Sequence, residues 1–100
     1  MIRGTTPTHE FTLSIDPSLV KDVEITYGQN DVVVLTKHLD DCTWQGNTLI
    51  LKLTQQDTFG FDHKKSVRVQ LRALLMDNTV VGSYVKTITV EKCLSDEVLA

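Results

Sequence analysis

The side chains that could bind a metal ion are scattered along this sequence. They are His9, His38, His63, Cys42, Cys93, Asp40, Asp41 and Asp62. Structural zinc sites usually contain closely spaced pairs such as CxxC or HxxxH, and the chain has no such pair. His38, Asp40 and Cys42 alternate, so a strand would place them on one face. They lie in a polar connection, however, and we expect a solvated edge here and no metal ion.

Covalent and acid–base catalysis need groups that this sequence does not place together. A nucleophilic thiol would need Cys42 or Cys93 beside a histidine and an orienting group. The chain has no nucleophile elbow and no glycine-rich phosphate loop. The adjacent acids at residues 40–41 and 96–97 repel each other, which favours solvent over a shared cleft. We therefore predict no catalytic residue, no cofactor-binding residue and no enzymatic activity.

Trp44 is the main candidate for binding a small ligand. It lies beside the turn-forming residues 45–47, where an exposed indole could stack on a sugar ring. The competing interpretation places Trp44 over the core as a lid, because large aromatic side chains are mostly buried.

The formal net charge of −3 argues against nucleic acid as a partner, because proteins that bind it usually carry a basic excess. A local exception is formed by Lys64, Lys65, Arg68 and Arg72. Arg68 and Arg72 share the solvent face of one predicted strand. A plain solvated face is the simpler interpretation of this group, and a contact surface is the functional one.

The length of 100 residues indicates a single domain, large enough for its own core. No stretch approaches the roughly 18 apolar residues that cross a bilayer, and residues 1–7 lack an apolar signal core. We therefore expect no membrane partner and a location in the cytoplasm. Cys42 and Cys93 are too few for a disulfide scaffold. Whether they pair stays open, with free thiols favoured in a reducing compartment.

Period-two alternation of apolar and polar residues predicts β-strands along most of the chain. It is clearest in residues 67–76, where valine and leucine alternate with arginine and glutamine. Asp77-Asn78 then forms a tight turn into a second strand within residues 79–90. Shorter strands are predicted for residues 11–15, 23–27, 32–37, 42–44 and 48–53.

Two short helical turns are predicted between the strands. Thr54, followed three residues later by Asp57, is typical of a helix N-terminus, where both side chains accept backbone N–H groups. The other turn is expected in residues 18–21. The inward face of residues 79–90 stays open, because Val81 and Val85 follow one phase while Ile88 and Val90 follow the other. A β-bulge within residues 85–87 would reconcile the two phases.

About seven short strands joined by hairpins favour an all-β fold, an antiparallel two-sheet sandwich of immunoglobulin-like type. A small barrel is the alternative. Trp44 lies only two residues after Cys42, so the spacing is not that of an antibody domain.

The expected domain spans residues 1–100, with an extended arm at 1–8 and a tail at 94–100, both suited to docking on neighbouring molecules. The apolar run at residues 32–35 is either buried on both faces or in contact with a partner, because an exposed edge invites strand addition. The candidate interaction surface comprises Thr5, Thr6, Val32, Val34, Trp44, Arg68 and Arg72.

Five segments carry a family resemblance. They are Met1-Ile2-Arg3-Gly4-Thr5-Thr6-Pro7-Thr8, Asp41-Cys42, Gly46-Asn47-Thr48, Leu53-Thr54-Gln55-Gln56-Asp57-Thr58 and Val90-Glu91-Lys92-Cys93-Leu94. Together they resemble small uncharacterised proteins encoded in prophages and mobile elements of Gram-positive gut bacteria. The resemblance covers the whole chain but brings no catalytic motif and no site residues.

The resemblance implies a structural or accessory phage component. Its partners would be other phage proteins or further copies of itself, and it could be incorporated into a virion. From sequence we therefore expect a non-enzymatic module that acts through protein–protein contacts. The alternative is a small ligand- or carbohydrate-binding sandwich with Trp44 as its stacking residue.

Overall fold

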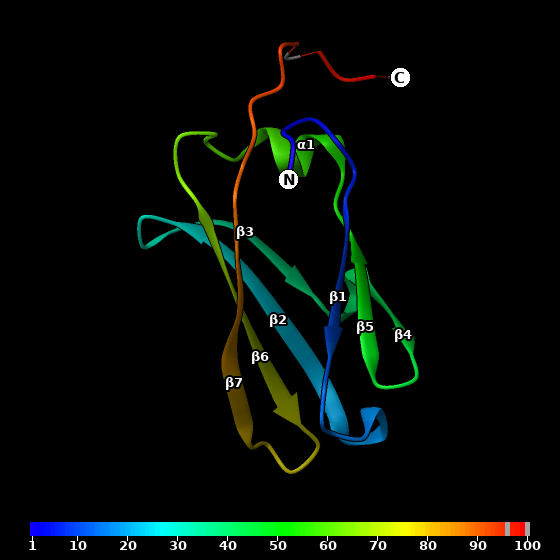
Figure 1. The fold of residues 1–100 in the computed structure, drawn as a ribbon. Coiled ribbons are helices and arrows are strands. Elements are labelled where there is room, and N and C mark those ends of the chain that lie inside the picture. The colour runs from blue at the N-terminus through cyan, green and yellow to red at the C-terminus, as the bar shows by residue number, and fades with distance from the viewer. Residues whose placement is uncertain (96, 100) are drawn as a thin grey trace.

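Seven strands form two antiparallel sheets that pack face to face (Figure 1). The computed structural model describes residues 1–95 and 97–99, and for residues 83–85 it describes the backbone alone. The expected all-β architecture of two antiparallel sheets is confirmed.

The smaller sheet has three strands in the order β1-β5-β4. Its strands are β1 (Thr8–Thr12), β4 (Cys42–Gln45) and β5 (Thr48–Lys52). The β4–β5 turn has Gly46 at φ 60°, a backbone region that glycine enters without steric cost. The strand predicted at residues 11–15 begins earlier, at Thr8, and ends at Thr12. Directly after it, the side chain of Asn47 donates to the Leu13 carbonyl at 2.6 Å.

The larger sheet has four strands in the order β3-β2-β6-β7. Its strands are β2 (Val20–Gln29), β3 (Val32–His38), β6 (Val67–Leu75) and β7 (Val80–Ile88). The β2–β3 hairpin turns at Asn30 and Asp31, with φ of 50° and 61°. Two consecutive positive φ values are typical of a two-residue hairpin turn, whose twist matches that of the strands it joins. The strand predicted at residues 23–27 is therefore longer at both ends, and β2 includes Gly28 and Gln29.

The β6–β7 hairpin lies where Asp77-Asn78 predicts a turn, but only Asn78 has a positive φ, at 68°. The expected bulge is confirmed, because Val69 pairs with Lys86 while Gln70 pairs with Tyr84, which leaves one extra residue in β7. Val81 and Ile88 therefore both pair with core-facing residues of β6. The bulge resolves the phase conflict of this strand.

The core lies between the two sheets and consists of alternate residues from their inner strands. Leu49 and Leu51 from β5 meet Ile25 from β2 and Val69 from β6, and all four are fully buried. Burying each such side chain contributes roughly 1.5–3 kcal/mol. The alternation of apolar and polar residues in the sequence therefore corresponds to the buried and outer faces of these strands.

The helical segments are short. Helix α1 (Gln55–Phe59) begins with the predicted capping pair: Thr54 Oγ1 accepts from the Asp57 amide at 3.0 Å, and Asp57 accepts from the Thr54 amide at 2.9 Å. Two further segments are 3₁₀ turns, η1 (Pro17–Leu19) and η2 (Leu39–Asp41). The first begins one residue before the range of 18–21 that the sequence predicts.

The N-terminal arm is docked on its own domain. The Arg3 amide donates to the Glu91 carbonyl at 3.1 Å, beside the end of β7. The next two residues of the arm bind the side chain of Thr58 in α1. Its Oγ1 accepts from the Gly4 amide at 2.9 Å and donates to the Thr5 carbonyl at 2.8 Å. The arm therefore closes one end of the sandwich beside α1, and is not a free extension (Figure 1).

Candidate interaction surface

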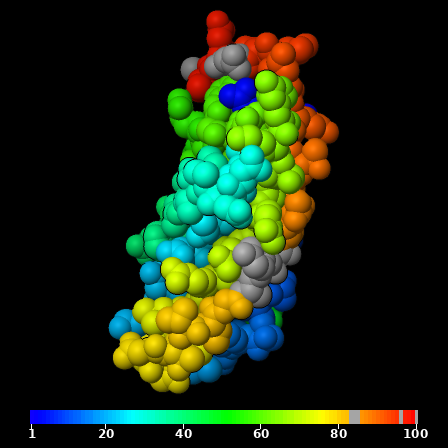
Figure 2. Space-filling view, turned by 90° about the vertical axis from the view of Figure 1, so that its left-hand side faces the viewer, coloured from blue at the N-terminus to red at the C-terminus, as the bar shows by residue number. Residues whose placement is uncertain are grey.

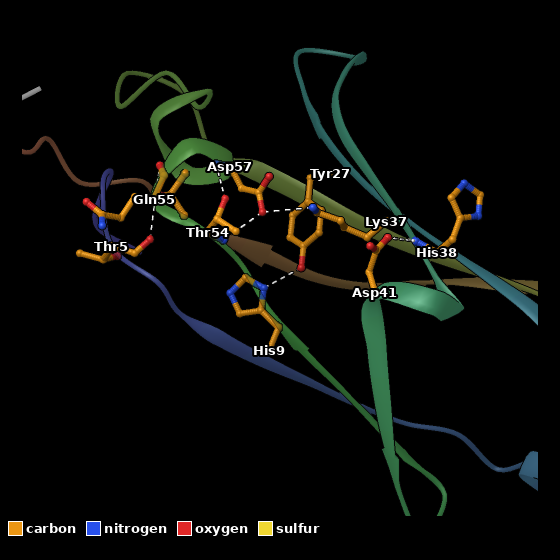
Figure 3. A network of polar contacts seen from close by, with 10 residues as sticks. Thr5, His9, Tyr27, Lys37, His38, Asp41, Thr54, Gln55 and Asp57 are labelled. Carbon is orange, nitrogen blue, oxygen red and sulfur yellow. Dashed lines mark hydrogen bonds and ion pairs between the residues drawn. The ribbon is translucent and has the colours of Figure 1, made fainter. Parts of the chain in front are cut away.

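A buried hydrogen bond joins the two sheets. His9 on β1 and Tyr27 on β2 lie 2.6 Å apart, measured from Nδ1 to Oη (Figure 3). Burial lowers the pKa of His9, assisted by the positive charges of Lys86 and the N-terminal amine. Burial also raises the pKa of Tyr27 above its ordinary value. Both groups are therefore neutral near pH 7, and the pair holds the sheets together.

An ion pair lies beside this hydrogen bond. Lys37 on β3 is 3.2 Å from Asp57 of α1, which joins the edge of the larger sheet to the helix (Figure 3). Burial acts to raise the pKa of Asp57, but the Thr54 amide and the Lys37 ammonium together hold it below its ordinary value. The whole cluster is satisfied internally, which is typical of a structural network rather than a reactive one.

The two cysteines differ from activated thiols in what the structure shows of Cys42. Cys42 is half-buried, and burial raises its pKa to about 11, which keeps the thiol protonated at neutral pH. Cys42 and Cys93 are both free thiols, so the open question of their pairing is answered in this structure.

The candidate metal ligands are not gathered. Within residues 1–95 and 97–99, no group of three or more His, Cys, Asp or Glu side chains could hold an ion. His38, Asp40 and Cys42 alternate in sequence, but η2 interrupts the strand between them. His38 instead lies 3.7 Å from Asp22.

The outer face of the larger sheet has hollows that are bordered by exposed apolar side chains. Its upper end, at the β2–β3 turn, has a hollow of about 200 Å³. Gly28 lines this hollow, and a Cβ there would make a tight contact, 3.3 Å from the Val32 carbonyl oxygen. Val32 and Val33 beside it are 63% and 62% exposed. The hollow is lined by Thr26, Gly28, Asp31, Val32, Val33, Arg68 and Gln70.

The lower end of the same face has a second hollow, of about 180 Å³. Leu74 and Val80, which pair across β6 and β7, line it together with Asp22 and His38. Val80 is 57% exposed. Met76 and Leu19 extend this apolar area around the end of the sheet, because the Met76 amide donates to the Leu19 carbonyl at 2.9 Å.

The predicted surface residues fall in different places. Arg68 lies at the upper hollow and Arg72 at the lower one, where Arg72 donates to Glu24 at 2.7 and 2.9 Å. Val32 lies at the upper hollow, whereas Val34 packs against the core. Figure 2 shows this side of the molecule, with residues near 32 in cyan and residues near 78 in yellow.

The remaining predicted residues lie away from this face. Trp44 is half-buried and packs against the core from β4, as the lid interpretation expects. Thr5 and Thr6 are exposed on the docked arm. Of the two alternatives for residues 32–35, burial on both faces is wrong, because β3 is an edge strand with Val32 and Val33 in solvent. Contact with a partner stays a prediction.

Sequence reasoning missed the apolar side chains at the lower end. Leu19, Met76 and Val80 are all more than half exposed. The available signal was an apolar residue directly beside turn chemistry, as in Leu19 after Asp16-Pro17-Ser18. That signal does not distinguish an exposed side chain from a buried one.

Both edges of the larger sheet are protected against strand addition. Each carries a bulge, in the β2–β3 pairing beside Gly28 and in β7 before Lys86. Each also directs one lysine inward: Lys37 to Asp57, and Lys86 to within 5.7 Å of the Phe11 ring centre. Bulges and inward charges are the usual defences of an edge strand. The face is therefore a better contact surface than the edges.

Within the described part of the chain, no helix is long and apolar enough to cross a membrane. Comparisons of the chain with protein-family models, curated proteins and solved structures found no match. The proposed function therefore rests on the fold and on the chemistry of the surface.

Proposed function

We propose that this chain is a non-enzymatic β-sandwich module that acts through protein–protein contacts, with the outer face of the larger sheet as its contact surface. One observation carries the proposal: four strongly exposed apolar side chains border hollows on this face and at its lower end. Val32 and Val33 border the upper hollow, Val80 borders the lower one, and Met76 borders a third at the end of the sheet. Single exposed apolar residues are ordinary, but their gathering beside hollows is typical of interaction sites.

The proposed fold type is immunoglobulin-like. The orders β1-β5-β4 and β3-β2-β6-β7 correspond to strands B-E-D and C′-C-F-G of such sandwiches. Ile2 makes a parallel bridge with Glu91, which resembles a first strand that joins the sheet of the last one. The His9–Tyr27 bond would then join strands B and C, which in antibody domains carry one cysteine of the B–F disulfide and the buried tryptophan.

The sequence resemblance suggests the biological setting of these contacts. We expect a structural or accessory phage component in the host cytoplasm or in a virion, whose partners are phage proteins or further copies of the chain. Two observations support protein partners. The net charge of −3 argues against nucleic acid, and the outer face carries exposed apolar side chains.

The test is a pair of substitutions on the face. Val33→Asp and Val80→Asp place a charge at each hollow, and we expect either one to weaken binding of a partner at least tenfold, about 1.4 kcal/mol. Binding would be measured by calorimetry against the purified products of the neighbouring genes. Thr43→Asp, on the exposed outer side of β4, is the matched control. Equal binding by all three variants would remove this face from the proposal.

The second candidate function is binding of a small ligand such as a carbohydrate, because Trp44 is half-buried rather than fully enclosed. Trp44 is the single tryptophan of the chain, so its fluorescence reports on this site directly. We expect no change in emission across an oligosaccharide panel, because the indole packs against the core. Saturable quenching by one sugar would favour the ligand-binding function instead.

A further inference from the structure

A row of three side chains crosses the lower end of the outer face. Asp22 of β2 pairs with Leu74 of β6, and Leu74 pairs with Val80 of β7, so the strand register places them side by side. All three line the lower hollow. Neighbouring strands lie about 4.8 Å apart, so the row extends roughly 10 Å from the backbone of Asp22 to that of Val80. The row is charged at one end and apolar at the other.

The apolar surface continues from this row around the end of the sheet. Met76 and Leu19 are 59% and 52% exposed, and both line a further hollow together with Asp77. The carboxylate of Asp77 accepts from the Thr79 amide at 3.0 Å, which fixes it in the β6–β7 turn. An acid therefore lies beside the apolar side chains at this end too.

More acids lie on the side of β3. Asp22, Asp40 and Asp41 line a wide hollow that also reaches Leu74. Asp40 and Asp41 are exposed on η2, so their charges face solvent. The lower patch, as we call this surface, comprises Leu19, Asp22, Asp40, Asp41, Leu74, Met76, Asp77 and Val80.

Few positive charges balance these aspartates. Among the described residues, Lys21 is the one lysine that lines the three hollows of the lower end. Arg72 also lies there, but it donates to Glu24 at 2.7 and 2.9 Å, so the two charges of this pair cancel. His38, whose Nδ1 is 3.7 Å from Asp22, adds a positive charge only when it is protonated. Four carboxylates therefore remain against one lysine.

The charge of the lower patch restricts what can cover it. Nucleic acid and acidic membrane surfaces are repelled, and so is a second copy of the patch. One metal ion does not fit either, because within residues 1–95 and 97–99 no three His, Cys, Asp or Glu side chains are gathered to hold it. Carboxylates spread around an apolar centre suit several cationic groups that belong to one apolar surface.

We propose that the lower patch binds a partner protein through a segment in which lysine or arginine residues flank apolar side chains. The proposal rests on the proposed function and names the chemistry of the partner at one end of the same face. Leu74, Met76 and Val80 cover the apolar part of the segment, and this burial provides most of the affinity. The aspartates pair with its basic groups, which orients the segment and speeds the encounter.

The test uses three synthetic peptides that share the same leucine and valine positions. The residues between these positions are all lysine, all glutamine or all glutamate. About eight residues are enough to cross the patch, at roughly 3.3 Å per residue. Nuclear magnetic resonance of the isotope-labelled chain measures the affinity and also locates the contact.

We expect the lysine peptide to bind most tightly and to shift the amide signals of Asp22, Leu74 and Val80. The glutamine peptide binds more weakly, and the glutamate peptide does not bind. Raising the salt from about 0.1 M to about 1 M should weaken the lysine peptide most, because the screening length falls from about 10 Å to about 3 Å.

Matched substitutions at the two ends of the face show which charges matter. Asp40→Asn should weaken binding of the lysine peptide about two- to fivefold, the range for one exposed ion pair. Asp31→Asn makes the same change at the upper hollow and should have no effect; asparagine tolerates the positive φ of this residue. Val80→Lys should abolish binding, whereas Val33→Lys, at a similarly exposed position of the upper hollow, should not. Thermal unfolding checks that each variant keeps the fold.

Three results would overturn the inference. They are lysine and glutamate peptides that bind equally, equal effects of Asp40→Asn and Asp31→Asn, and a lysine peptide that does not bind at about 1 mM, the limit of weak affinity.

The proposed function is tested separately with the neighbouring gene products. Val80→Asp and Val80→Lys both remove the apolar side chain but add opposite charges, so binding of a basic partner is weakened more by lysine. Equal losses would leave the face as the contact surface and remove only its basic partner. No loss with either variant would count against the proposed function itself.

Discussion

Tyr27→Phe is expected to lower the free energy of unfolding by about 1–3 kcal/mol, the cost of leaving a buried polar group without its partner. The aromatic ring stays in the core, but Nδ1 of His9 loses the hydroxyl that lies 2.6 Å away. Urea unfolding followed by circular dichroism measures the change. Tyr27→Phe combined with His9→Leu removes both polar groups, and we expect it to recover much of the loss.

The same pair makes stability depend on pH. The pKa of His9 is lowered from 6.5 in the folded protein, so the unfolded chain binds more protons between the two values. Stability is therefore full above pH 6.5 and falls as the pH drops toward the folded pKa. The decline should vanish in the double variant and persist in His63→Gln, a control at a half-buried position of the loop before β6. An unchanged decline in the double variant would assign the pH dependence to other groups.

Thr58→Val is expected to destabilise the protein by about 1–3 kcal/mol, again because buried polar groups lose their partners. Thr58 is completely buried, and valine keeps its shape. The substitution leaves the Gly4 amide and the Thr5 carbonyl without the hydroxyl that links the arm to α1. A loss of this size should lower the melting temperature by roughly 4–8 °C per kcal/mol in a domain of this length.

Thr43→Val is the matched control, because Thr43 is exposed on β4. Hydrogen exchange provides a second measurement for Thr58→Val, which should raise exchange at Arg3 and Gly4 more than at the β2–β6 pairs. Uniform acceleration across the sheet would indicate global destabilisation without release of the arm.

The sequence by itself determined the local structure of this protein. The alternation in β6, the capping pair Thr54 and Asp57, and the turn at Asn78 follow from interactions between residues a few positions apart. The bulge in β7 was also predictable, because two apolar phases in one strand need an extra residue between them.

Only the tertiary structure decided which distant groups meet and which apolar residues stay outside. His9 reaches Tyr27 and Thr58 reaches Thr5 across 18 and 53 positions, and neither pairing leaves a periodic signal in the sequence. The run at residues 32–35 illustrates the same limit. Its composition suits a central strand, but β3 lies at the edge of the sheet. Strand order, which arises from the packing of the whole chain, determined that Val32 and Val33 face solvent.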